Sequence, residues 1–168
     1  TGGSLGARAI NEGIVEQFDK LIAEDFQIIW HTGKANYEKY KHLENEKCKI
    51  FDFIHEIGKA YAVSDLIVTR AGGILFEVFV AGKPAIVLPS PYVADDHQTS
   101  NAKALESRNA ALMIQDQNSK TDLVPNIIEL IHDEVKMNEM TENMKKLAKP
   151  HASTEIAEKI LKTQGIPF

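Results

Sequence analysis

A glycine-rich turn at the start of the chain has the composition of a phosphate-binding loop. Residues 2–7 read Gly-Gly-Ser-Leu-Gly-Ala and run directly into a segment with helical spacing. Glycines let the backbone approach an anion closely, and a helix N-terminus presents N–H groups and the positive end of its dipole. Gly3 would provide backbone contact, and Ser4 can add a hydroxyl donor. Taken alone, the motif fits a tight turn without a ligand equally well.

The position of this turn in the sequence is unusual. Such a turn normally follows a buried strand of an α/β sheet, whereas only Thr1 precedes it here. The sequence also does not start with Met. We therefore expect it to be an excised piece of a larger protein.

A second turn of the same kind occupies residues 70–73, which read Arg-Ala-Gly-Gly. Two such turns at neighbouring strand ends could hold the two phosphates of a diphosphate. Glu77 follows about one helical turn later, and its carboxylate can accept the two hydrogen bonds that a ribose offers. A solvated glutamate favoured by the helix dipole explains Glu77 equally well.

A dense polar cluster occupies residues 95–102, with the sequence Asp-Asp-His-Gln-Thr-Ser-Asn-Ala. Either aspartate could simply be a helix N-cap. His97, Gln98 and Asn101 nevertheless place imidazole and amide groups on about one helical turn. Groups of this kind recognise hydroxyl-rich ligands such as sugars.

An apolar pair, Phe53–Ile54, follows a predicted strand and could flank a flat base, with backbone groups reading the edge of the base. Ordinary core packing is the alternative. Outside the polar cluster, no histidine has metal-ligand spacing to another His or Cys. We interpret these histidines as structural: His31, His42, His55, His132 and His151.

The elements that must position these groups alternate along the chain. Apolar runs predict strands at residues 26–31, 48–51, 66–68, 85–88 and 110–114. Helical spacing predicts helices at residues 7–23, 36–43, 57–63, 74–81 and 97–107, with Gly82 ending the fourth. From Thr121 onward only helices are expected, broken near Asp133 and Pro150.

Strands that are apolar throughout are typical of a parallel sheet covered by helices on both faces. Alternating strands and helices with right-handed crossovers give a doubly wound layout. The sequence therefore predicts one α/β domain over residues 1–168, with a Rossmann-like doubly wound parallel sheet and a helical C-terminal extension.

Composition narrows the classes of protein. The 168 residues are 43% hydrophobic and 26% charged, as in an ordinary soluble domain, and the net charge of −5 argues against nucleic acid as the main partner. The single cysteine, Cys48, excludes an internal disulfide and a cysteine-rich metal site, which fits a cytosolic protein. No run reaches the roughly 18 apolar residues of a membrane span.

Six motifs in order resemble one family. They are GGSLGAR, WHTGK, FI, RAGG with a following glutamate, GKPAIVLPSP and DDHQTSNA. Together they resemble the C-terminal domain of the MurG family of peptidoglycan N-acetylglucosaminyltransferases, over nearly the whole chain. The resemblance implies one half of a GT-B fold, in which two Rossmann-like domains face each other across a cleft.

The resemblance also implies a role for each site residue. The C-terminal domain of this family binds UDP-N-acetylglucosamine. Carried over by motif, Gly3 and Ser4 would contact the diphosphate, and Ile54 would meet the uracil through its backbone. The second phosphate-facing turn would consist of Arg70, Gly72 and Gly73. Glu77 would hold the ribose hydroxyls, and the sugar hydroxyls would be read by His97, Gln98 and Asn101.

One departure from the family pattern concerns Glu77. The family typically has one more residue between the Arg-x-Gly turn and the glutamate, and a Ser or Thr in that segment. Here the segment is Gly73-Ile74-Leu75-Phe76-Glu77, without a hydroxyl. The segment therefore offers no hydroxyl to contact a phosphate. The direction in which Glu77 points is also open, because one residue turns a helix by about 100°.

The implied reaction transfers N-acetylglucosamine from UDP to undecaprenyl-pyrophosphoryl-N-acetylmuramoyl-pentapeptide, lipid I, to form lipid II in peptidoglycan synthesis. The family works by inversion, without a metal or other cofactor. Both helix N-termini and Arg70 would stabilise the charge that develops on departing UDP. The full-length enzyme would lie in the bacterial cytoplasm, peripheral to the inner membrane.

The catalytic residues, the lipid-linked acceptor site and the membrane-facing surface would belong to an N-terminal domain that this sequence lacks. We therefore expect weak donor binding without turnover, because a half-cleft lacks the wall that desolvates its ligand. Two alternatives stay open. One is a stand-alone sugar-nucleotide-binding subunit of a two-subunit transferase. The other is a Rossmann dehydrogenase, although the G-x-G-x-x-G spacing is missing.

Overall fold

The computed structural model describes residues 1–3 and 5–164. In this part of the chain, strands and helices alternate as predicted, and every strand pair is parallel. The strands are β1 (Ile28–His31), β2 (Cys48–Phe51), β3 (Ile67–Thr69), β4 (Ala85–Val87) and β5 (Ala111–Met113).

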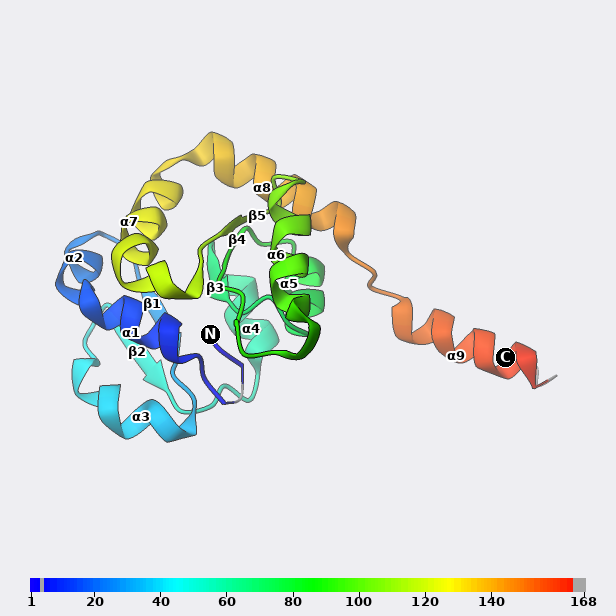
Figure 1. The fold of residues 1–168 in the computed structure, drawn as a ribbon, viewed down its shortest axis with the longest axis horizontal. Coiled ribbons are helices and arrows are strands. Elements are labelled where there is room, and N and C mark those ends of the chain that lie inside the picture. Colours follow the sequence, from blue (N-terminus) through cyan, green and yellow to red (C-terminus); the bar gives the residue numbers. More distant parts are fainter. Residues whose placement is uncertain (4, 165–168) are drawn as a thin grey trace.

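Helices connect the strands and follow the last one (Figure 1). They are α1 (Arg8–Glu16), α2 (Phe18–Ala23), α3 (Lys34–Tyr40), α4 (Ile57–Val63), α5 (Leu75–Ala81), α6 (His97–Glu106), α7 (Ser119–His132), α8 (Glu134–Leu147) and α9 (Ala152–Thr163). The described residues also form the short 3₁₀ helices η1 (Lys41–Leu43), η2 (Ala94–Asp96) and η3 (Asp116–Asn118).

The strands of the described chain form two parallel sheets rather than the single sheet that was predicted. One sheet has the order β1-β2 and the other the order β3-β4-β5. Thr1 lies between them. Its backbone nitrogen donates to the Val68 carbonyl on β3 at 2.7 Å, and its hydroxyl oxygen lies 3.0 Å from His31 Nδ1 on β1. Thr1, which leads into the glycine turn, therefore contacts both sheets.

Two hydrophobic cores cover the two faces, as a doubly wound layout requires. Strand β4 and the residue after it contribute to both, because Ile86 and Leu88 face one core while Ala85 and Val87 face the other. Helices α1, α2 and α7 close the first core, and α4, α5 and α6 close the second. Helix α8 contributes Met140 to the first core and Met144 to the second.

The predicted helix over residues 7–23 is wrong in one respect, because it breaks at Gln17 into α1 and α2. The Gln17 side chain contacts α7 at this break. Pro125 has no N–H for the carbonyl of Thr121, four residues earlier. Gln17 Nε2 donates to that carbonyl at 3.2 Å and to the Lys120 carbonyl at 2.8 Å. The break thus places an amide where α7 needs a donor.

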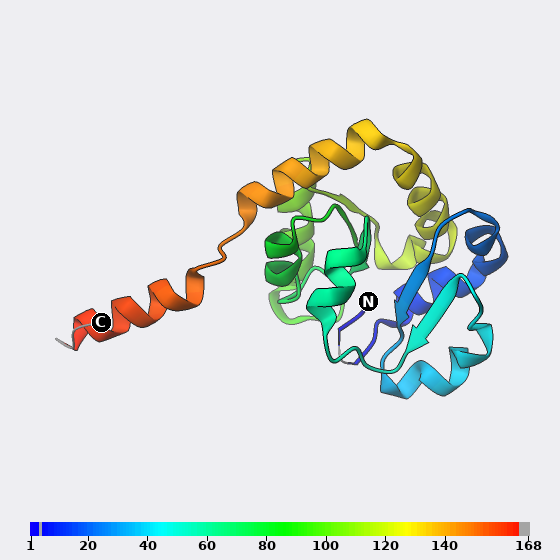
Figure 2. The same cartoon turned by 180° about the vertical axis from the view of Figure 1, so that it is seen from behind.

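The C-terminal helices break where the sequence predicted. Asp133 separates α7 from α8, and its carboxylate accepts from the Lys136 N–H at 2.9 Å as an N-cap. Pro150 lies in the gap between α8 and α9. Helix α9 projects away from the body of the molecule, as both views show (Figures 1 and 2). None of its residues is buried.

Candidate functional site

The glycine turn that precedes α1 folds tightly against β1. The Gly6 N–H donates to the Gly3 carbonyl at 2.9 Å. Gly6 has φ +75°, and a Cβ there would lie 2.1 Å from the Thr32 carbonyl oxygen, so only glycine fits. A Cβ on Gly3 would meet no atom within 4 Å. The turn is therefore closed toward the sheet and open at Gly3, and Ser4 lies outside the described residues.

Helix α1 begins directly after this turn. Ala7 occupies its N-cap position and provides no side-chain hydrogen bond to the first turn. The first N–H groups of a helix have no partner inside the helix, and they carry its positive dipole end. The geometry is therefore suited to an anion at the start of α1.

The second turn follows β3 and is held by Arg70. The Arg70 guanidinium donates to the Leu88 carbonyl at 3.1 Å and pairs with the Asp116 carboxylate. The two side chains are only 15% and 16% exposed. Arg70 thus joins the carboxyl ends of β3, β4 and β5. Asp116 was not singled out from the sequence, where its only signal was a polar run after the last strand.

Gly72 and Gly73 present the backbone of this second turn. Gly72 lies against α6, since a Cβ there would be 3.4 Å from Gln98 Nε2. A Cβ on Gly73 would meet nothing within 4 Å, and the residue is exposed. The space beside Gly73, like that beside Gly3, is therefore open to a ligand.

The amides of α6 bind the backbone of the neighbouring loops. Gln98 Oε1 accepts from the Ser90 N–H at 2.9 Å, and Asn101 Nδ2 donates to the Ala71 carbonyl at 3.0 Å. Asn101 therefore holds the second turn against α6, and Gln98 holds the loop after β4. His97, the first residue of α6, is exposed. Asp96 occupies the N-cap position of α6 without a side-chain hydrogen bond to the helix.

The Phe53–Ile54 pair lies in the loop after β2 and is half-buried. The Phe53 ring stands edge-on to His31, with 5.8 Å between ring centroids, and to His55, with 5.0 Å. The Phe53 N–H donates to Asp52 Oδ1 at 2.7 Å. The loop that would meet a base is thus packed on one side against β1.

Glu77 occupies the first turn of α5 and is exposed. It lies beside Tyr61 of α4. Burial raises the pKa of Tyr61 above its usual range, and the Glu77 carboxylate adds to the shift. The Tyr61 hydroxyl is buried and has no hydrogen bond of normal geometry to any described residue. Glu77 therefore faces α4, the helix that follows the Phe53–Ile54 loop.

A cavity of about 330 Å³ adjoins these loops at the carboxyl ends of β4 and β5. Its lining includes Arg8, Glu12, Tyr92, Asp116 and Lys120. Lys120 pairs with Glu12 at 3.4 Å across it. None of the predicted site residues lines this cavity.

Two further observations concern metal binding and membrane spanning. Within residues 1–3 and 5–164, no group of three or more His, Cys, Asp or Glu side chains could hold a metal ion. Over the same residues, no helix combines the length and the apolar character needed to cross a bilayer.

Comparison with known proteins gives a consistent set of relatives. Residues 1–160 match the family model of the glycosyltransferase family 28 C-terminal domain. The chain is 41% identical over 160 residues to the UDP-N-acetylglucosamine–N-acetylmuramyl-(pentapeptide) pyrophosphoryl-undecaprenol N-acetylglucosamine transferase of Cytophaga hutchinsonii, covering 95% of this chain and 43% of that protein. It is 41% identical over 168 residues to the transferase of the same name from Parabacteroides distasonis, with coverages of 96% and 45%. The chain thus spans about half the length of the curated relatives it matches.

Solved structures agree with this result. Acinetobacter baumannii MurG superposes with a TM-score of 0.79 at 29% identity, covering 96% of this chain and 48% of that one. The S. aureus MnaA–UDP structure superposes with a TM-score of 0.70 at 20% identity, covering 96% and 43%. The second likeness concerns the fold alone.

Proposed function

Because this chain belongs to the glycosyltransferase family 28 C-terminal domain family, we propose that it is the donor-binding half of an N-acetylglucosaminyltransferase. The donor is UDP-N-acetylglucosamine, and the acceptor is undecaprenyl-pyrophosphoryl-N-acetylmuramyl-pentapeptide, as the names of its relatives say of those proteins. The observation that carries the proposal is identity of about 40% to these transferases over 95% of the chain.

The diphosphate would lie between the two open turns. Gly3 and the uncapped start of α1 face it from one side, and Gly72 and Gly73 from the other. The charge of Arg70 is already paired with Asp116, so we assign it to holding the second turn rather than to the phosphates. Backbone N–H groups would then stabilise the charge that develops as UDP leaves.

The uridine would extend from the diphosphate toward β2 and α4. The backbone of Ile54 would meet the uracil. Glu77 faces α4 directly after that loop, which is where the ribose of the same nucleotide would lie. This placement supports the ribose role of Glu77 despite the shortened segment before it.

The N-acetylglucosamine would lie over the N-terminal turn of α6. His97 is exposed there. Gln98 and Asn101 already bind backbone groups, so each has only its remaining hydrogen-bonding capacity for the sugar. General base catalysis, acceptor binding and contact with the cytoplasmic face of the inner membrane belong to another domain in this proposal, and no metal or other cofactor takes part.

Calorimetric titration of the chain with UDP-N-acetylglucosamine, UDP-glucose and UDP tests the proposal. We expect all three to bind weakly, with UDP-N-acetylglucosamine tightest and no transfer to lipid I. Glu77→Ala should weaken all three alike, whereas Gln98→Ala should weaken UDP-N-acetylglucosamine more than UDP. Absence of uridine nucleotide binding would contradict the proposal, and transfer by the chain alone would contradict the assignment of catalysis to another domain.

A further inference from the structure

His31 is the last residue of β1 and is buried, with 4% of its surface exposed. The sequence offered no reason to single it out, and we interpreted it as structural. In the structure its Nδ1 lies 3.0 Å from the hydroxyl oxygen of Thr1. Thr1 leads directly into the glycine turn, and its hydroxyl also accepts from the Gly3 N–H at 3.3 Å. One side of the His31 ring is therefore joined to the entry of that turn.

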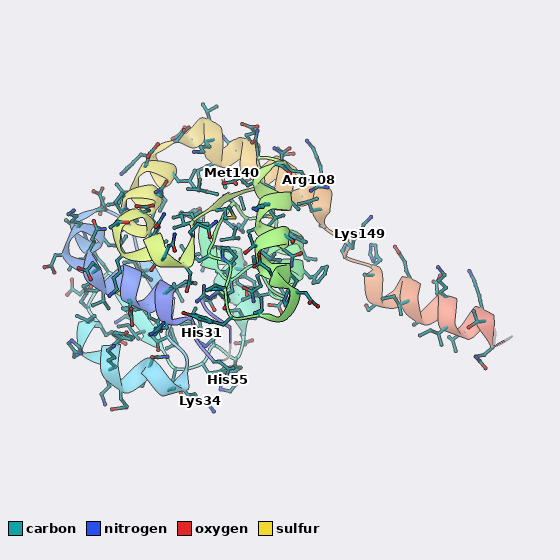
Figure 3. All side chains as sticks on the ribbon, viewed as in Figure 1. His31, Lys34, His55, Arg108, Met140 and Lys149 are labelled. Carbon is teal, nitrogen blue, oxygen red and sulfur yellow. The ribbon has the colours of Figure 1, made fainter. Side chains whose placement is uncertain are left out.

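The His31 ring also contacts the loop after β2, through Phe53. His31 pairs in register with Phe51, the last residue of β2, so the chain from Asp52 onward leaves the sheet beside it. The Phe53 ring meets His31 at 90°, and His55 meets Phe53 edge-on in turn. Figure 3 labels His31 and His55, and the Phe53 ring contacts both of them. His31 thus lies between two segments, at Thr1 and at Phe53, that are far apart in the sequence.

The second ring nitrogen of His31 is Nε2. His31 Nε2 is buried and makes no hydrogen bond of normal geometry to any described residue. Burial lowers the pKa of His31, and the backbone and carboxylate of Asp52 oppose the shift. The neutral form of the ring therefore predominates at pH 7. If the Thr1 hydroxyl donates to Nδ1, the ring proton is on Nε2, on the Asp52 side.

We propose that His31 is a positioning residue for the donor: its ring joins the entry of the glycine turn to the Phe53–Ile54 loop and holds the two at a fixed separation. One segment would grip the diphosphate and the other the base of the same nucleotide, so their separation must match one UDP. This inference rests on the proposed function. His31 acts through these two backbone segments and does not itself touch the nucleotide.

Three substitutions test the His31 ring and each of its two nitrogens separately. His31→Phe keeps the ring contact with Phe53 and removes both nitrogens. His31→Gln places an amide near the position of Nε2, and His31→Asn near that of Nδ1. His132→Gln is the control, because His132 is exposed on α7 and pairs only with Glu24 among the described residues. Thermal melts confirm that each variant folds.

UDP affinity by calorimetry and amide hydrogen exchange in the ligand-free chain are the two measurements. We expect His31→Phe to weaken UDP at least tenfold and to speed exchange at Phe53 and Ile54. At least one of the amide variants should recover most of both effects, and His132→Gln should match the wild type. In the wild type, long-range ¹H–¹⁵N spectra should show the proton on Nε2.

The outcomes are distinguishable. If the wild type binds UDP, and His31→Phe binds it equally well with unchanged exchange at Phe53 and Ile54, the role of His31 is wrong while the proposed function stands. If the wild type binds no UDP, the proposed function fails, and with it the donor role of His31. A loss of affinity in His31→Phe that neither amide variant reverses would also overturn the inference, since it would reflect packing alone.

Discussion

At the scale of single residues, the candidate site consists mostly of backbone. Gly3 and Gly73 have open surroundings, whereas the side chains of Arg70, Gln98 and Asn101 bind neighbouring backbone or a carboxylate. A diphosphate between the turns would thus be held by N–H groups, which need close approach rather than long side chains.

Gly73→Ala tests this directly. Gly73 does not have a positive φ, and an added methyl would meet nothing within 4 Å, so the fold should accept alanine with a melting temperature within about 2 °C of the wild type. UDP affinity should fall by about tenfold or more, or roughly 1.4 kcal/mol, because the methyl takes the space that the phosphate needs. Gly6→Ala is the contrasting variant, which should destabilise the fold itself. Unchanged UDP affinity in Gly73→Ala would exclude close approach at this turn.

The ionisation of His31 should also appear in the stability of the chain. Its folded pKa lies below the ordinary value of 6.5, so between pH 6.5 and the folded pKa the unfolded chain binds more protons than the folded one. The free energy of unfolding should therefore be highest above pH 6.5 and fall as the pH decreases. Urea denaturation from pH 7.5 to pH 5 should show a smaller decrease for His31→Gln than for the wild type. An identical pH dependence would mean that His31 does not titrate differently in the two states.

At the scale of elements, the carboxyl ends of three strands are joined by one ion pair. Arg70 leaves β3, binds the carbonyl after β4 and pairs with Asp116 after β5. Both side chains are mostly buried, so removing one leaves the other without its counter-charge.

Asp116→Ala should therefore lower the free energy of unfolding by about 2 kcal/mol, less than the 3–5 kcal/mol of a fully buried pair. Urea denaturation measures the loss. The double variant Arg70→Met with Asp116→Leu should recover much of it, since no unpaired charge then remains. If the single and double variants lose the same stability, the pair is not what holds the strand ends.

Some helices could be predicted from sequence patterns alone. Helices α4, α5 and α6 lie where apolar spacing predicted them, because each buries one face on the same core. Gly82 ends α5 with φ +62°, as expected of a C-terminal glycine. The contact of Gln17 with the carbonyl that Pro125 leaves free could not be predicted, because that carbonyl lies in a helix more than 100 residues away in the sequence.

At the scale of the whole molecule, the body, which is the part of the chain before α9, differs from α9 in its burial. The body has two cores on two faces of its sheets, whereas α9 buries none of its residues and projects into solvent (Figures 1 and 2). Since burial of apolar surface is the main source of stability, α9 should contribute little to the folding of the rest.

Deletion of residues 150–168 should consequently change the melting temperature of the body by less than about 2 °C. Circular dichroism would follow both the melt and the loss of helical signal from α9. UDP affinity should be unchanged as well. A decrease of 5 °C or more would show that α9 packs on the body in solution.

The sequence by itself determined the α/β class, the parallel pairing and the order of the elements, and it predicted the loops at which we propose that a nucleotide binds. These depend on local periodicity, glycine positions and short motifs, which neighbouring residues decide. Only the tertiary structure decided that Arg70 is paired with Asp116, that Glu77 faces Tyr61 and that His31 lies between two loops. Each of these contacts joins residues far apart in the chain, and the partner of a side chain depends on how whole elements pack rather than on its neighbours in sequence.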